Sequence, residues 1–177
     1  MIRFIFATAV VFAALPVMAF AGSPASADAN PAKTCKAQRT AIGAEAFKAM
    51  YNPTGTNSNA FGTCVSRAAR AEQENRTEAA KQCRTEQEDA NFAATHGGKS
   101  FAQFYGTNKN GHNAFGKCVS AKAEASSVAE QQTTLTAAKA CKAERAADRA
   151  AFEQKYGTNG NRRNAFGKCV SSKNKTQ

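Results

Sequence analysis

One short phrase recurs three times along the chain, and each copy carries a cysteine. It reads NAFGKCVS at residues 113–120 and again at 164–171, and NAFGTCVS at residues 59–66. A further cysteine precedes each phrase, so the six cysteines fall into three pairs. Between the two cysteines of each pair stands an F-x-x-x-Y motif at a constant distance from the second cysteine. We therefore expect three copies of one structural unit.

The first half of each copy has the composition of a helix. Ala, Glu, Lys, Arg and Gln, which are good helix formers, dominate the segments that lead to Phe47, Phe101 and Phe152. Gly43 and Asp148 stand where a new helical segment can start, which predicts a bend inside the first half. The F-x-x-x-Y spacing places both aromatic rings on one helix face, which favours core packing, while stacking against sugars or bases stays an alternative.

The second half of each copy predicts a turn and a second helix. Gly106 and Gly157 follow the tyrosines where a left-handed C-cap is expected. Asn59, Asn113 and Asn164 stand at the expected N-cap of the second helix, after which Phe, Cys and Val share one face. A glycine inside this helix costs about 1 kcal/mol relative to alanine, so its recurrence predicts close approach of the partner helix. These glycines are Gly62, Gly116 and Gly167.

Bulky aliphatic residues are scarce after the first 21 residues. Ile42, Met50 and Leu135 are the only residues of their types there, and the chain has no tryptophan. A small unit with so thin a core usually needs covalent crosslinks, and an even number of cysteines can supply them as disulfides. Because the two helices of a copy face each other, we expect each disulfide to lie within one copy. The expected pairs are Cys35 with Cys64, Cys83 with Cys118, and Cys141 with Cys169.

The expected fold is all-α, with three tandem disulfide-stapled helical hairpins joined by largely helical linkers after an N-terminal signal peptide. The linkers contain neither Gly nor Pro. The sequence leaves open whether they are continuous helices, and a soft break between Ser126 and Thr136 is the favoured arrangement. The expected boundaries are 1–21 for the signal peptide, 22–32 for a flexible segment, 33–68, 80–122 and 137–173 for the repeats, 69–79 and 123–136 for the linkers, and 174–177 for the tail.

The repeat resembles one found in short exported proteins of high-GC Gram-positive (actinobacterial) genomes. The resemblance rests on units such as CKAERAADRAAFEQKYGTNGNRRNAFGKCVS and covers about Lys33 to Ser172. In that group an Asp-Pro often stands where Asp148 and Arg149 stand here. The resemblance implies export and a repeat architecture, and it brings no catalytic residues.

The N-terminus has the pattern of a secretory signal peptide. A basic start at Arg3 precedes an apolar run that contains Pro16, and Ala19 and Ala21 form a small-x-small cleavage pattern. No second apolar run follows, so we expect a mature chain without a membrane span. The predicted location is secreted, either extracellular or associated with a bacterial cell envelope.

The chain is strongly basic, with a formal net charge of +11. Cations cluster in the turns and in the second helices of the last two copies, near helix N-termini that also favour anions. One interpretation is a surface that only keeps the protein soluble. The other is non-specific binding of an anionic partner, namely a cell-wall polymer, a lipid surface or extracellular nucleic acid. The candidate anion-binding residues are Lys109, Lys117, Arg162, Arg163 and Lys168.

Catalytic and metal chemistry finds little support in the residue pattern. There is no C-x-x-C motif and there are only two histidines, which argues against zinc; the asparagine-rich turns lack the carboxylates that calcium needs. The other two repeats hold Ser58 and Arg163 at the position of His112. The repeated cysteine is therefore not kept for activation by a histidine, which argues against cysteine catalysis. We expect no cofactor and a non-enzymatic protein. The competing hypothesis is an enzyme or enzyme inhibitor with a site in the second repeat, where an insertion predicts a surface turn. The residues of that site are His96, Gly97, Gly98 and His112.

Overall fold

The computed structural model describes residues 30–52 and 59–175, and every regular element within them is an α-helix. The predicted signal peptide and most of the following segment lie outside the described residues. The helices are α1 (Pro31–Ile42), α2 (Ala44–Tyr51), α3 (Ala60–Glu88), α4 (Phe92–Thr95), α5 (Phe101–Tyr105), α6 (Ala114–Ala147), α7 (Arg149–Tyr156) and α8 (Ala165–Asn174). The all-α expectation is confirmed.

Both predicted bends are present. Gly43 separates α1 from α2 with φ of +86°, a conformation that glycine adopts without a side-chain clash. Asp148 separates α6 from α7, and its carboxylate caps α7 by accepting a hydrogen bond of 2.9 Å from the Ala151 N–H. The first half of the first and third repeats is therefore two helices joined at an angle, which lets the aromatic residues fold back beside the cysteines.

The linkers are continuous helices, so the predicted soft break between Ser126 and Thr136 is wrong. The linker 69–79 lies inside α3, and the linker 123–136 lies inside α6. The two helices pack antiparallel along one another, with the small side chains of Ala79, Ala123 and Ser127 buried. Because neither segment contains Gly or Pro, and because the small residues allow close approach, nothing forces the helix to break.

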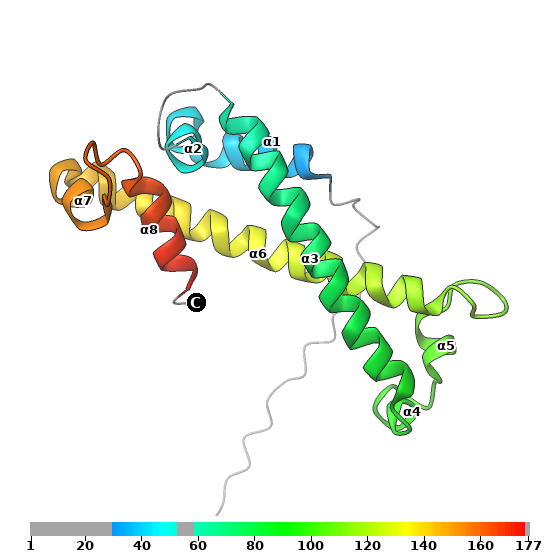
Figure 1. The fold of residues 1–177 in the computed structure, drawn as a ribbon. Coiled ribbons are helices and arrows are strands. Elements are labelled where there is room, and N and C mark those ends of the chain that lie inside the picture. Colours follow the sequence, from blue (N-terminus) through cyan, green and yellow to red (C-terminus); the bar gives the residue numbers. More distant parts are fainter. Residues whose placement is uncertain (1–29, 53–58, 176–177) are drawn as a thin grey trace, which may run out of the picture.

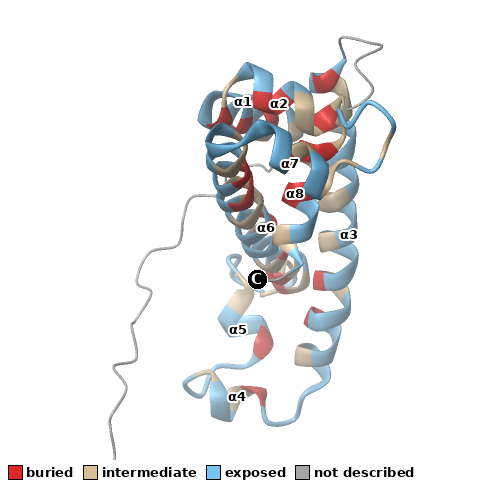
Figure 2. Ribbon diagram, turned by 90° about the vertical axis from the view of Figure 1, so that its left-hand side faces the viewer, coloured by how far each residue is buried: buried red, intermediate tan, exposed pale blue. Residues whose placement is uncertain are grey.

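The repeats do not stack in chain order. Figure 1 shows the first and third repeats together at one end of the α3–α6 pair, whereas α4 and α5 of the second repeat lie at the other end. The first and third repeats share one core cluster, which includes Phe47, Phe152 and Phe166. The second repeat has a separate, smaller cluster around Phe92 and Phe101. In Figure 2 the buried positions of the long helices face inward at both ends.

The aromatic pairs belong to these cores, as their spacing predicts. The ring centroids of Phe47 and Tyr51 lie 4.8 Å apart, and the matching pairs in the other two repeats are 5.0 Å apart. The Phe-Cys-Val face of the phrase is fully buried only in α8, because α2 and α7 both cover it. In α3 the corresponding Phe61 is 38% exposed.

Two smaller expectations about glycine are wrong. Gly106 and Gly157 have φ of −68° and −73°, so they end their helices in an extended rather than a left-handed conformation. The glycine of the phrase is not approached by the other helix of its own hairpin. A side chain would clash with the cap residue Asn59 at Gly62 and would meet nothing within 4 Å at Gly116. At Gly167 the nearest group is the Met50 carbonyl of the first repeat, 3.4 Å away.

Candidate functional site

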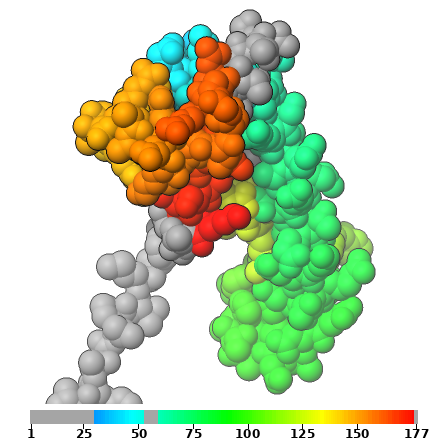
Figure 3. Space-filling view, turned by 60° about the vertical axis from the view of Figure 1, so that its left-hand side comes forward, coloured from blue at the N-terminus to red at the C-terminus, as the bar shows by residue number. Residues whose placement is uncertain are grey.

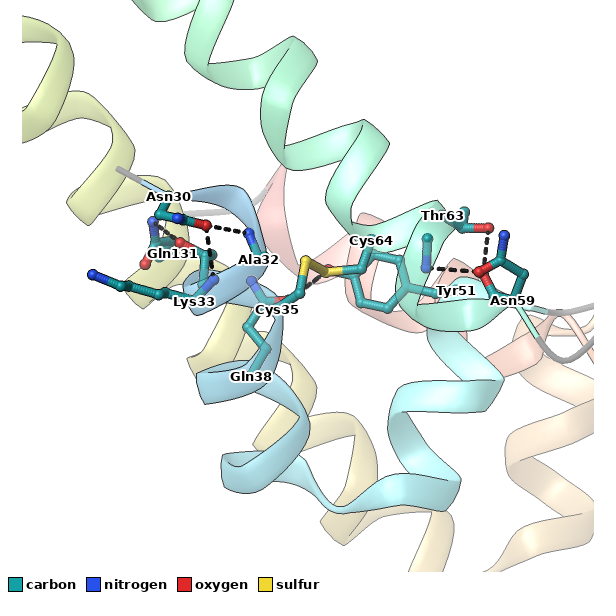
Figure 4. Close-up of a disulfide and its surroundings, with 12 residues drawn as sticks. Asn30, Ala32, Lys33, Cys35, Gln38, Tyr51, Asn59, Thr63, Cys64 and Gln131 are labelled. Carbon is teal, nitrogen blue, oxygen red and sulfur yellow. Dashed lines mark hydrogen bonds between the residues drawn. A yellow bond between two sulfur atoms is a disulfide. The ribbon is translucent and has the colours of Figure 1, made fainter. Parts of the chain in front are cut away.

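Each repeat is closed by the disulfide that its sequence predicts. The bonds join Cys35 to Cys64, Cys83 to Cys118 and Cys141 to Cys169, with Cα–Cα distances of 5.9, 6.0 and 6.0 Å. All six sulfur-bearing residues are at most 1% exposed. The disulfides are therefore buried structural crosslinks between the two arms of each hairpin, as Figure 4 shows for the bond between α1 and α3.

A tyrosine hydrogen bond accompanies each disulfide. The residue three positions after the first cysteine accepts a hydrogen bond from the tyrosine hydroxyl of the same repeat. In the first repeat the acceptor is Gln38, whose Oε1 lies 2.6 Å from the Tyr51 hydroxyl (Figure 4). In the second it is Glu86, 2.8 Å from the Tyr105 hydroxyl, and in the third it is Glu144.

The acceptor is charged only where a lysine is available to neutralise it. Lys122 lies 2.8 Å from Glu86, and Lys173 lies 3.3 Å from Glu144; both lysines stand four positions after the second cysteine. In the first repeat that position holds Ala68, and the acceptor is the neutral Gln38. The first repeat therefore lacks both the carboxylate and the lysine. Its acceptor, Gln38, is the most deeply buried of the three, at 7% exposure, where an unpaired charge would be costly. Both substitutions are visible in the sequence once the repeats are aligned.

These contacts change the pKa values of the groups involved. Burial opposes ionisation of Glu86, but hydrogen bonds from Lys122 and Tyr105 outweigh it and lower its pKa. Burial and the hydrogen bond to Glu86 raise the pKa of Tyr105 to about 12. The hydrogen bond from Lys155 lowers the pKa of Glu144. Glu86 and Glu144 therefore stay ionised and Tyr105 stays neutral near pH 7.

In the second and third repeats, two hydrogen bonds between an asparagine and a threonine hold the turn, and the sequence pattern did not predict them. Asn164 accepts a hydrogen bond of 3.1 Å from the Thr158 N–H and donates one of 2.7 Å to the Thr158 hydroxyl. Asn113 binds Thr107 in the same two ways. Only Asn59 uses its side chain as the predicted N-cap. The sequence feature that could have predicted these hydrogen bonds is the threonine six positions before Asn113 and before Asn164.

The five candidate anion-binding residues do not form one patch. Lys109 and Lys117 belong to the second repeat, while Arg162, Arg163 and Lys168 belong to the third, at the opposite end of the molecule (Figure 1). All five are exposed, and none makes an ion pair with a residue that the structure describes. Arg162 also has a positive φ of 52°, which is uncommon for a residue with a side chain.

The two histidines of the second repeat have different surroundings. The His96 ring stacks on Phe92 with 3.7 Å between ring centroids, and its Nδ1 lies 2.8 Å from the Phe92 carbonyl oxygen. Gly97 and Gly98 form the predicted surface turn, both with positive φ. His112 instead lines a cavity of about 630 Å³ that His96 does not border. An enzyme or inhibitor site built on both histidines stays a prediction.

A larger groove lies between the first and third repeats. It has a volume of about 650 Å³ and is lined by residues of α1, α2, α3, α6 and α8. Figure 3 shows α8 and α3 on either side of a recess in which part of α6 is visible. The Cys35–Cys64 disulfide contributes to its wall through Cys64. The groove exists because the first and third repeats pack together, an arrangement that the repeat pattern alone did not predict.

Two amides at this groove, those of Gln38 and Asn174, each have one hydrogen-bonding atom without a partner among the described residues. The Oε1 of Gln38 binds Tyr51, but its Nε2 has no hydrogen bond to any described residue. Asn174 donates to the Thr134 hydroxyl at 3.2 Å, whereas its Oδ1 is buried without a partner in the described chain. An unpaired buried polar atom is costly, so water or a ligand is expected to satisfy Asn174 Oδ1.

Three cations and two carboxylates line the groove, which leaves it with a net positive charge. Arg67, Lys168 and Lys175 line it and make no ion pair with described residues. The carboxylates that line it already have partners. Glu72 pairs with Arg76 at 2.8 Å, and Glu130 accepts a hydrogen bond of 3.1 Å from Asn75.

Within the described residues no group of three or more His, Cys, Asp or Glu side chains is arranged to hold a metal ion. Nor does any described helix combine the length and apolar character needed to cross a membrane. The chain matches no protein-family model, and comparisons with curated proteins and with solved structures give no match either.

Proposed function

We propose that the protein is an exported, non-enzymatic helical scaffold that binds anionic polymers or surfaces of the cell envelope or the extracellular space. Its three buried disulfides support export, because such crosslinks form and persist in oxidising compartments. The single observation that carries the binding proposal is the excess of exposed cations that have no acidic partner in the described part of the chain, whose full sequence has a net charge of +11.

The distribution of these cations favours a weakly selective mode of binding. The turn cations lie at both ends of the molecule, so they attract a polyanion through a broad field rather than through one shaped site. Such binding releases counterions from the polymer and weakens steeply as salt rises.

The test is retention of the protein on immobilised inorganic polyphosphate at increasing salt. We expect binding at low salt, a steep fall with salt, and weaker binding by a variant with Lys109→Ala, Arg162→Gly and Arg163→Ala. Glycine is chosen at residue 162 because of its positive φ. The proposal would be contradicted if binding were independent of salt and unchanged in this variant, but lost after His96→Ala or His112→Ala. That result would favour the specific site in the second repeat.

A further inference from the structure

We infer that the groove between the first and third repeats binds a segment of an acidic polysaccharide, that is, a hydroxyl-rich chain that also bears carboxylate or phosphate groups. The inference rests on the proposed function and names the ligand class and the place for it. It starts from the groove's volume of about 650 Å³, which lies within the range of about 300–1,000 Å³ typical of ligand sites.

The interior of the groove suits hydroxyl groups. It offers a donor at Gln38 Nε2 and an acceptor at Asn174 Oδ1, neither of which has a partner among the described residues. Ser127 and Thr134 also line it, and their hydroxyls, which accept hydrogen bonds from Asn75 and Asn174, can still donate. A hydroxyl donates and accepts at once, so a polyhydroxyl chain can satisfy both kinds of atom, which a phosphate ester oxygen or an apolar group cannot.

Gln38 shows that this polarity is built into the core of the molecule. Gln38 is 7% exposed and its Oε1 is held by the Tyr51 hydroxyl at 2.6 Å, so its amide group is fixed, and Nε2 has no hydrogen bond to a described residue. The equivalent residues of the other repeats are carboxylates that a lysine satisfies. The first repeat alone therefore presents a neutral donor at this position, and it does so where the third repeat closes the groove.

The rim selects for acidic groups. Arg67, Lys168 and Lys175 are exposed and line the groove without an acidic partner among the described residues, while Glu72 pairs with Arg76 and Glu130 accepts a hydrogen bond from Asn75. A chain with hydroxyls inside and acidic groups at the rim meets both sets of atoms. A polyanion without hydroxyls can meet the rim cations and the Gln38 donor, but it has no donor for Asn174 Oδ1.

The test compares three probes by titration calorimetry at moderate salt: an oligogalacturonate, a neutral dextran oligomer of similar length, and inorganic polyphosphate. The groove variant is Lys168→Ala with Lys175→Ala, and the matched control is Lys109→Ala with Lys117→Ala, which removes the same charge from the distant second repeat. We expect the groove variant to weaken oligogalacturonate binding about five- to tenfold, as for two exposed charge contacts, and the control to leave it within about twofold. For polyphosphate the two variants should weaken binding equally, because it senses the overall field.

Asn174→Ala supplies an uncharged second test. It should weaken oligogalacturonate several-fold and leave polyphosphate unchanged, with folding checked by circular dichroism. Equal effects of the groove variant and its control on oligogalacturonate, or dextran binding as tightly as oligogalacturonate, would overturn the inference. Binding of polyphosphate without binding of oligogalacturonate would overturn it while leaving the proposed function standing. Binding of neither anion would overturn both.

Discussion

Replacing Gln38 by glutamate would place in the first repeat the carboxylate that the other two repeats carry. Glu86 and Glu144 tolerate their charge because lysines lie 2.8 and 3.3 Å away, whereas the first repeat has Ala68 at the lysine position. A carboxylate at residue 38 would therefore be buried without a cation in direct contact. We expect Gln38→Glu to destabilise the protein at neutral pH.

The magnitude follows from the protonation that the variant can adopt. Holding a glutamic acid neutral at pH 7 costs at most about 3.7 kcal/mol, since its ordinary pKa is about 4.3. The guanidinium of Arg67, which lies 5.7 Å from the Tyr51 ring centroid, would offset part of this cost across solvent. We therefore expect a loss of about 2 kcal/mol at pH 7.

The pH dependence gives the sign of the effect. Burial raises the folded-state pKa of the new carboxyl above its unfolded value, so the loss is present at high pH and disappears as pH falls below about 4. The assay is urea unfolding followed by circular dichroism at pH 7 and pH 4. A second substitution, Ala68→Lys, should restore at least half of the loss at pH 7, measured as the coupling in a double-mutant cycle. A Gln38→Glu protein as stable as the parent at pH 7, or a coupling near zero, would refute the reasoning.

Two further outcomes follow from the local geometry. Tyr105, with a pKa of about 12, should ionise above the usual pH range of tyrosine in an absorbance titration, and Tyr105→Phe should remove that step. Because the folded-state pKa is raised, the stabilisation by its hydrogen bond to Glu86 is complete below about pH 10 and is lost as pH rises toward 12. Gly43→Ala should lower the free energy of unfolding by about 1 kcal/mol in thermal unfolding, because residue 43 has φ of +86°. Gly116→Ala should raise it by up to about 1 kcal/mol, because residue 116 lies in a helix and a side chain there meets nothing within 4 Å. A gain at residue 43 or a loss at residue 116 would contradict the backbone assignment.

The hairpins and their disulfides were predictable because their signals are local and repeated. The repeated phrase, the F-x-x-x-Y motif and the paired cysteines fix which helices face each other inside one repeat. The capping role of Asp148 was also readable, since a short acidic side chain before a helix is a strong N-cap. Each of these features depends on residues close in sequence.

The packing between repeats was not predictable in the same way. Nothing in three similar units says that the first would share a core with the third rather than with the second. Which repeats share a core depends on the length and straightness of α3 and α6. In α6 the weak break signals between Ser126 and Thr136 do not interrupt the helix, because Ala79, Ala123 and Ser127 pack between the two long helices. The groove between the repeats follows from it. The paired change of Gln38 and Ala68, in contrast, was present in the aligned repeats and could have been found.

The account depends on the disulfides compensating for small cores, most of all in the second repeat, whose buried cluster consists of Cys83, Phe92, Phe101, Ala114 and Cys118. On the chain-entropy model each bond contributes about 3.6–3.8 kcal/mol for its loop length. Removing the bond between Cys83 and Cys118 should therefore release this repeat without releasing the shared core of the other two.

The most direct measurement is amide hydrogen exchange, followed by mass spectrometry, on the double variant Cys83→Ala with Cys118→Ala. The account predicts that protection is lost between residues 92 and 119 and kept in α1, α2, α7 and α8, and that Cys141→Ala with Cys169→Ala disturbs its own repeat less. Full protection of the second repeat without its disulfide would contradict the account.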